Sequence, residues 1–327
     1  MRSAFLIFFL LITTSGAHAG ELTGMGGFMH SWNSEINDSS YSWQLEYREE
    51  LSKRFAASFS YLNEGHVPGH HRDGMALQLW TESDLIDRRL TLSGGIGPYY
   101  YFNTTTPSDN GFYSNDHDPG VLFTLAAIWR TDSPWIFQLR SNWVKTVGSI
   151  DSVSALAGIG YQLEPSPRFS RQLDSPTEPQ ERIKKNEITI FAGCTITNSF
   201  DSEQSTSLGI EYRRALMQYL DLTVSWLYEG DTRLIRRDGL ISQLWAVKAF
   251  QNDRISLGFG AGAYFSIDQQ TGLNQNENND SIISGIATMS GSYRLDPHWS
   301  LRISWNRIIT NYDRDTDVIM GGIGYRF

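Results

Sequence analysis

Three histidines and an aspartate lie within eight residues of one another, and their side chains could do chemistry together. They are His66, His70, His71 and Asp73. Imidazole and carboxylate groups at this spacing are suited to binding a transition metal or to moving protons in a hydrolytic reaction. Either use requires a fold that brings the four groups to one side of the chain.

The same stretch of sequence occurs twice, and the second copy lacks the histidines. Glu64, Arg72 and Asp73 return 165 residues later as Glu229, Arg237 and Asp238, with their glycines. The positions that match the histidines hold Asp231, Ile235 and Arg236. Because only the acidic, arginine and glycine residues are shared, we expect a bend closed by an ion pair, with a glycine in a turn conformation. The pattern favours a structural role for this segment, and we expect no catalytic residue, metal or cofactor there. A metal-binding or catalytic site built from the three histidines is the alternative.

A second repeated pair consists of a glutamate and an arginine two positions apart. The four residues are Glu46, Arg48, Glu211 and Arg213. In both copies they alternate with apolar neighbours, as side chains on opposite faces of a β-strand do. We expect all four to face a polar interior, where charges stabilise a barrel or set ion selectivity.

The elements that position these residues are predicted to be β-strands. Trp43, Leu45 and Tyr47 alternate with polar residues, and the stretch from Ile255 to Phe265 alternates in the same way. A period of two over eight or more residues indicates strands, and helical periodicity is nearly absent. About sixteen such segments begin near Gly24, Tyr41, Arg54, Gly74, Arg88, Gly120, Trp135, Asp151, Glu187, Thr206, Tyr219, Gly239, Arg254, Ser281, Trp299 and Thr316. The sequence predicts an all-β protein.

Three features favour a transmembrane antiparallel barrel over two sheets stacked in water, the alternative. The segments are about ten residues long, which a tilted membrane-spanning strand needs. One face of each segment is apolar, and the other is small or polar. Trp and Tyr lie towards segment ends, as at membrane interfaces: Trp43, Tyr61, Trp80, Tyr99, Trp129, Trp135, Tyr161, Trp226 and Trp245.

The two ends of the chain indicate an exported protein. Residues 1–19 contain Arg2, an apolar run from Ala4 to Ile12 and the sequence Ala17-His18-Ala19, the pattern of a cleaved signal peptide. The alternating aromatic ending, Ile323 to Phe327, resembles the C-terminal signal of bacterial outer-membrane proteins. That resemblance implies an integral protein of the bacterial outer membrane.

The repeat extends over most of the mature chain and predicts a tandem duplication of an eight-strand unit. We expect residues 20–164 to form the first unit and residues 187–327 the second, joined by a Pro- and charge-rich linker at 165–186. An even number of strands in each unit puts the linker and both termini in the periplasm. The longer loops then face outside: Asn63–Asp73, Asn103–Pro119, Glu229–Asp238 and Gln269–Asp280.

The number of strands does not show whether they close into one barrel or into two. One sixteen-stranded barrel would enclose an aqueous lumen, whereas eight strands leave room only for interior side chains. We favour one sixteen-stranded barrel because only the second unit ends in the terminal Phe signal; two eight-stranded barrels are the alternative.

Composition excludes other classes. The formal net charge of −9 argues against a strongly basic nucleic-acid binder. The single cysteine, Cys194, excludes an intramolecular disulfide framework and a thiolate-rich metal cluster.

Each unit resembles the eight-stranded barrels of the lipid A 3-O-deacylase and OmpA-like superfamily, most closely in the last hairpin, Leu301 to Phe327. In the deacylases the penultimate strand carries a His-x-Ser-Asn motif. Ser141-Asn142 and Asn306 match parts of that motif, but Leu139 occupies the histidine position and no histidine lies near Asn306. Without a histidine base the serine is not activated in the usual way, so we expect no enzyme.

The leading hypothesis is an outer-membrane pore that passes polar solutes or glycan, for example an exopolysaccharide export port. Its partners would be outer-membrane lipid, polysaccharide and periplasmic export proteins, and Tyr99–Phe102 or Tyr264-Phe265 would stack on sugars. One alternative is a structural or adhesion barrel whose external loops, Asn103–Asp118 and Asn274–Asp280, bind a partner. Another is a lipid A-modifying acyl hydrolase-like enzyme that uses the histidine segment.

Overall fold

The computed structural model describes residues 20–32, 37–86, 89–105, 113–164, 185–199, 201–232, 234–268 and 283–327. These residues form sixteen strands, each starting within six residues of a predicted start. They are β1 (Gly20–Trp32), β2 (Asn37–Glu50), β3 (Phe55–Val67), β4 (His70–Leu85), β5 (Leu90–Thr105), β6 (Ser114–Arg130), β7 (Trp135–Thr146), β8 (Asp151–Gln162), β9 (Asn186–Thr197), β10 (Gln204–Met217), β11 (Leu220–Asp231), β12 (Arg236–Phe250), β13 (Ile255–Asp268), β14 (Ile283–Arg294), β15 (Trp299–Ile309) and β16 (Thr316–Arg326). The all-β prediction is confirmed.

Two predicted segments fall largely or wholly outside the described residues. They are the signal peptide at 1–19 and the linker at 165–186, of which 165–184 is not described. Among the described residues, no helix is long and apolar enough to cross a membrane.

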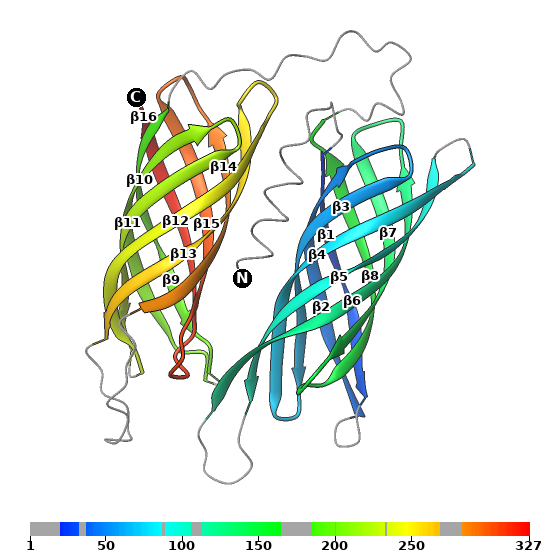
Figure 1. Ribbon diagram of the computed structural model, residues 1–327, viewed down its shortest axis with the longest axis horizontal. Helices are drawn as coiled ribbons and strands as arrows, with labels where there is room; N and C mark the ends of the chain where they lie inside the picture. Colours follow the sequence, from blue (N-terminus) through cyan, green and yellow to red (C-terminus); the bar gives the residue numbers. More distant parts are fainter. Residues whose placement is uncertain are drawn as a thin grey trace. The chain divides into compact units, whose positions relative to one another are not determined.

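The sixteen strands close into two separate antiparallel barrels of eight (Figure 1). In barrel 1, β1–β8, Gly24 on β1 pairs with Leu45 on β2 and with Ile159 on β8. In barrel 2, β9–β16, Ile190 on β9 pairs with Ile210 on β10 and with Ile323 on β16. The chain correspondingly divides into two compact units.

The prediction of one sixteen-stranded barrel is therefore wrong, and the alternative of two eight-stranded barrels holds. The reason lies in the strand edges. β1 and β9 each hydrogen-bond to a neighbour on both sides within their own repeat. No edge of either unit is left to pair with the other unit, and closure satisfies the backbone groups that an open edge would expose.

Each barrel has an apolar exterior and a largely polar interior. Exposure alternates along β7 without a break, with Trp135, Phe137 and Leu139 outside and the intervening side chains buried. Among the most exposed apolar side chains are Phe28 and Leu125, at 75% and 71%. A closed barrel with its apolar side chains outside and its charges inside suits a hydrocarbon surround rather than water.

A buried apolar layer crosses the interior of each barrel at equivalent positions. In barrel 1 it contains Met25, Leu62, Ala76, Tyr99, Tyr101, Leu122, Val144 and Leu156. In barrel 2 it contains Phe191, Leu227, Ile241, Tyr264, Ile286, Ile308, Val318 and Met320. Most of these residues correspond through the 164–166-residue offset of the repeat. The repeated sequence thus gives each unit its own core.

Two of the tryptophans predicted to lie at the membrane interface are interior instead. Trp80 and Trp245 are each 1% exposed. They fit because glycine faces them: a Cβ on Gly95 would lie 2.7 Å from the Trp80 ring, and one on Gly260 would lie 2.5 Å from the Trp245 ring. Tyr61 and Tyr99 are also buried, whereas Trp43, Trp129, Trp135 and Trp226 are exposed as predicted.

Candidate functional site

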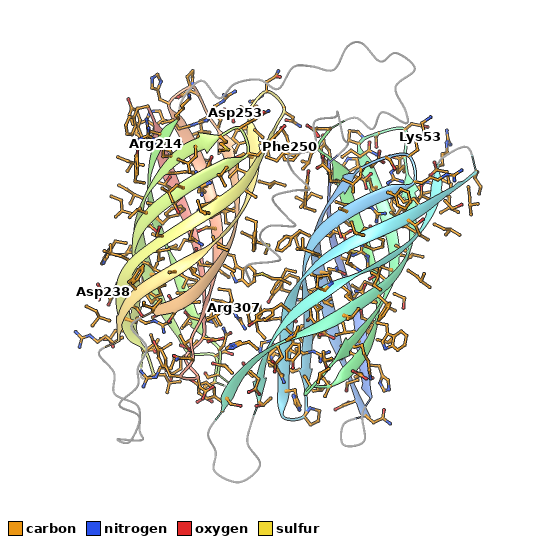
Figure 2. The ribbon with its side chains drawn as sticks, viewed as in Figure 1. Lys53, Arg214, Asp238, Phe250, Asp253 and Arg307 are labelled. Carbon is orange, nitrogen blue, oxygen red and sulfur yellow. The ribbon has the colours of Figure 1, made fainter. Side chains whose placement is uncertain are left out.

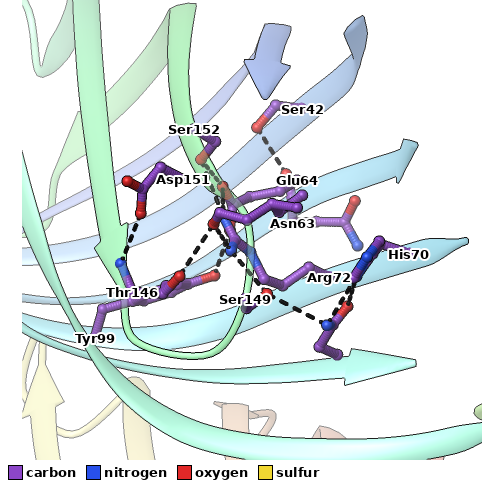
Figure 3. A network of polar contacts seen from close by, with 12 residues as sticks. Ser42, Asn63, Glu64, His70, Arg72, Tyr99, Thr146, Ser149, Asp151 and Ser152 are labelled. Carbon is purple, nitrogen blue, oxygen red and sulfur yellow. Dashed lines mark hydrogen bonds and ion pairs between the residues drawn. The ribbon is translucent and has the colours of Figure 1, made fainter. Parts of the chain in front are cut away.

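The repeated glutamate and arginine form a buried ion pair inside barrel 1 (Figure 3). Arg72 Nε and Nη2 donate to the two carboxylate oxygens of Glu64 at 2.6 and 2.8 Å. Tyr99 Oη donates to Glu64 at 2.9 Å, and the Ser152 hydroxyl also donates to Glu64. Arg72 Nη1 donates to Ser149 Oγ at 3.2 Å. The pair therefore connects β3 and β4 through the interior to β5, β8 and the β7–β8 turn.

Barrel 2 contains the same arrangement. Arg237 donates to both carboxylate oxygens of Glu229 at 2.6 and 2.8 Å, and both side chains are fully buried. Thr316 Oγ1, at the position of Ser152 in the repeat, donates to Glu229 at 2.6 Å. Arg237 Nη1 donates to Tyr312 Oη at 2.9 Å.

The predicted bend at Glu-Gly is a β-bulge. The register of β3 and β4 shifts between Asn63 and His66, and the same shift occurs in β11 between Tyr228 and Asp231. Gly65 has a φ of +69° and Gly230 a φ of +91°, which glycine adopts without steric cost. The predicted loops at 63–73 and 229–238 are largely strand, because β3 continues to Val67 and β12 begins at Arg236.

The repeated aspartates occupy equivalent positions on the strand that follows each bulge. Asp73 Oδ2 accepts a hydrogen bond from Tyr61 Oη at 2.7 Å. Asp238 Oδ2 accepts one from Trp226 Nε1 at 3.1 Å. Tyr61 and Trp226 are themselves equivalent in the repeat. Each aspartate therefore fixes an aromatic side chain of the neighbouring strand.

A second layer of ion pairs lies deeper in barrel 1. Arg140 donates to both oxygens of Glu46 at 2.9 and 2.5 Å, and Arg48 Nη2 donates to Glu82 at 2.5 Å. The Arg48 and Arg140 guanidinium carbons lie 4.3 and 5.0 Å from the centre of the Trp80 ring. All these side chains are buried. Two cations and one aromatic ring fill this level of the interior.

At the corresponding level of its interior, barrel 2 has a different set of ion pairs. Glu211 contacts Arg213 at 3.2 Å and Arg302 at 2.7 Å, and Arg302 also contacts Glu187 at 2.6 Å. The Arg213 guanidinium carbon lies 4.1 Å from the centre of the Trp245 ring. The repeated glutamates and arginines thus face the interior of both barrels, but their partners differ.

Sequence reasoning missed four of these partners: Arg140, Arg302, Glu82 and Glu187. The repeat pairs Arg140 with Ser304 and Arg302 with Gln138, so neither arginine belongs to the shared framework. The signal that could have found them is strand parity, because Arg140 shares the inward phase of β7 with Gln138 and Asn142.

The cavities inside barrel 2 are small. One of about 20 Å³ lies beside Glu211, Trp245 and Asn306, and one of about 40 Å³ lies near Lys185 and Arg302. A water molecule needs roughly 10–15 Å³ of such space. These two cavities therefore have room for a few waters each. Because the strands close into two barrels of eight, the described residues do not form the large lumen that motivated the pore hypothesis.

The aromatic residues proposed to stack on sugars do not line a passage. Tyr99 and Tyr101 of barrel 1 and Tyr264 of barrel 2 are buried in the interior packing. Phe102 lies on the other face of β5, buried against Tyr100 and His117, and Phe265 faces outward at 46% exposure.

The histidines lie at the tip of the β3–β4 hairpin. His66 and His71 are cross-strand partners with stacked rings, 3.9 Å between centroids. The His70 ring contacts the Asn103 amide instead. In the equivalent place barrel 2 holds an exposed ion pair, Asp231 with Arg236 at 3.8 Å. Within the described ranges, no group of three or more His, Cys, Asp or Glu could hold a metal ion.

The two residues of β7 that match part of the deacylase motif lie on opposite faces of the strand. Ser141 lies on the exterior, whereas Asn142 is buried and contacts Gln44 at 3.0 Å and Thr124 at 2.9 Å.

No family model and no curated protein matches the chain. Among solved structures, it is similar to the N-terminal β-barrel domain of Pseudomonas aeruginosa OprF, with 11% identity and a TM-score of 0.36, over 44% of this chain and 96% of that one. It is also similar to Neisserial surface protein A, with 12% identity and a TM-score of 0.34, over 44% and 96%. The third is Ail of Yersinia pestis, with 10% identity and a TM-score of 0.35, over 45% and 98%.

Each of these likenesses covers about the length of one barrel. At such identities and TM-scores they carry no functional information about this chain. The assignment to a membrane rests on the closed barrels themselves, with their apolar exteriors and charged interiors.

Proposed function

We propose that the chain is an integral protein of the bacterial outer membrane whose two filled barrels serve as a rigid scaffold for surface-exposed hairpins that bind a partner. The observation that carries this proposal is the interior of each barrel. Bidentate buried ion pairs join β3 to β4 at Glu64 and β11 to β12 at Glu229, and hydrogen bonds from Ser152 and Thr316 link these pairs across the interior to β8 and β16. Such an interior supports rigidity and leaves the projecting hairpins as the surface that can bind a partner.

The hairpin best suited to binding is β5–β6. Its strands have 16 and 17 residues. A strand of 16 residues tilted by about 45° rises about 38 Å, whereas the apolar band of an outer-membrane barrel is about 25 Å tall. The end of this hairpin therefore projects well beyond the hydrocarbon region. Of the loops in the adhesion hypothesis, it includes the described part of Asn103–Asp118, while Asn274–Asp280 lies outside the described residues.

The projecting part of β6 presents acidic side chains. Asp116 and Asp118 are exposed. Asp116 is held by hydrogen bonds from the Thr105 and Ser114 hydroxyls at 3.2 and 3.4 Å. Two exposed carboxylates on a projecting hairpin, one of them held by hydrogen bonds, favour a cationic partner such as a lysine-rich peptide segment.

A binding assay on intact cells tests this function. The D116N/D118N variant is expected to bind a fluorescent lysine-rich peptide several-fold more weakly, with less salt dependence, while its barrel folds normally. D231N is the matched control, because Asp231 is an exposed carboxylate at the equivalent end of barrel 2 that is already paired with Arg236. Equal binding by the wild type and the D116N/D118N variant would contradict the proposal.

A further inference from the structure

A hollow of about 340 Å³ opens at the end of barrel 2 that carries the C-terminus. It is lined by the β12–β13 turn, the β14–β15 turn and the end of β16. The residues that matter are Asp253, Arg254, Arg294, Leu295, Asp296 and Arg326. Figure 2 shows Asp253 at this end of the barrel, beside Phe250.

Positive charge exceeds negative charge in this hollow. Arg294 Nη1 and Arg326 Nη2 both donate to Asp253 Oδ2, each at 3.0 Å. Arg326 also lies 3.7 Å from Glu187, but Glu187 is shared with Arg302. Three guanidinium groups therefore face two carboxylates in the lining.

Arg254 is the exposed cation of the three. Its guanidinium carbon lies 5.3 Å from the centre of the Tyr293 ring, an interaction that leaves its N–H donors at the surface. Among the described residues, its side chain makes no ion pair. Arg254 is thus the group best placed to receive an anion.

The surroundings of the hollow are those of a membrane interface. Leu295 is 55% exposed, and Trp299 and Tyr325 are exposed and in contact, 5.1 Å between ring centroids. Amphipathic aromatic residues gather where hydrocarbon meets headgroups. The hollow therefore lies at headgroup level, with apolar surface beside it.

Barrel 1 also carries arginines at the equivalent place, but the described ones are paired. Arg89, which corresponds to Arg254, is paired with Asp132 at 3.2 Å, and Arg130, which corresponds to Arg294, is paired with Glu21 at 2.9 Å. Gln162 occupies the position of Arg326. Arg254 of barrel 2 therefore differs from its described counterpart in barrel 1 by lacking a carboxylate partner.

We propose that this hollow binds the phosphodiester headgroup of an anionic phospholipid. The Arg254 guanidinium would donate to the phosphate oxygens, a geometry for which this group is suited. A single negative charge matches the excess of one cation, and Leu295 offers apolar surface to the start of an acyl chain. The location in the periplasmic leaflet rests on the proposed orientation, with both termini in the periplasm.

Native mass spectrometry of the refolded mature chain tests this site. With phosphatidylglycerol we expect one lipid to be retained preferentially, and R254Q to weaken its binding about fivefold, the effect of one cation near an anionic lipid. R89Q is the matched control and should not change binding. Phosphatidylethanolamine, which has the phosphate but no net charge, should bind more weakly.

Any one of three results would overturn the proposed lipid site. The first is that R254Q and R89Q have the same effect on lipid binding, and the second is that phosphatidylethanolamine binds as well as phosphatidylglycerol. The third is full competition by inorganic phosphate at equal concentration, which would indicate a free-phosphate site. The measurement does not depend on orientation or on the β5–β6 hairpin. Its failure is therefore distinguishable from failure of the D116N/D118N assay on cells.

Discussion

Removing the charge of Glu64 should destabilise the protein strongly, while removing the charges of both Glu64 and Arg72 should cost much less. In E64Q, Arg72 stays 1% exposed and loses the carboxylate that accepts two of its hydrogen bonds. An unpaired buried charge costs about 3–5 kcal/mol, whereas replacing a buried pair with neutral residues of similar volume is often nearly neutral. We therefore expect E64Q to lose about 3–5 kcal/mol and E64Q/R72M to recover at least about 2 kcal/mol of that loss.

The free energy of unfolding can be measured by denaturant titration in phospholipid vesicles, followed by tryptophan emission. D231N is the control because it breaks an exposed ion pair, with side chains 54–56% accessible, and such pairs contribute at most about 1 kcal/mol. The reasoning is refuted if E64Q costs no more than D231N. It is also refuted if the second substitution adds to the loss instead of reversing it.

Three further substitutions test the interior packing and the bulges. G260A should cost about 1–3 kcal/mol by overpacking, since the added Cβ would lie 2.5 Å from the Trp245 ring, and G321A, with open space around it, should be near neutral in the same titration. G65A should be destabilising by at least about 1 kcal/mol, because φ is +69° and the Cβ would lie 2.3 Å from Ser40 Oγ; a loss no larger than that of G321A would contradict the bulge. W80A should cost about 3–5 kcal/mol by removing the ring beneath Arg48 and Arg140, and a loss below that of G321A would show that the interior is loosely packed.

The sequence predicts the strands and the inward charges well, because both follow from local alternation. The period of two that places Glu46 and Arg48 inside is visible without knowing the closure of the sheet. The Glu-Gly bulge is also visible, since the repeat isolates the residues that both barrels need.

The alternation does not show whether the strands close into one barrel or two. The side chains of a strand alternate between interior and exterior in the same way in a barrel of eight strands and in one of sixteen. What decides it is the pairing of β1 with β8, a contact between segments over 100 residues apart. One local signal pointed that way: Trp80 shares the inward phase of Gln78 and Glu82, and large inward side chains opposite glycine are typical of a filled barrel.

The central claim, that both barrels are filled, is tested most directly by the conductance of the refolded mature chain in a planar lipid bilayer. The buried ion pairs and water-sized cavities predict no steady ohmic steps of porin size. Reproducible steps of that size, abolished by denaturing the protein, would contradict the account and restore the pore hypothesis.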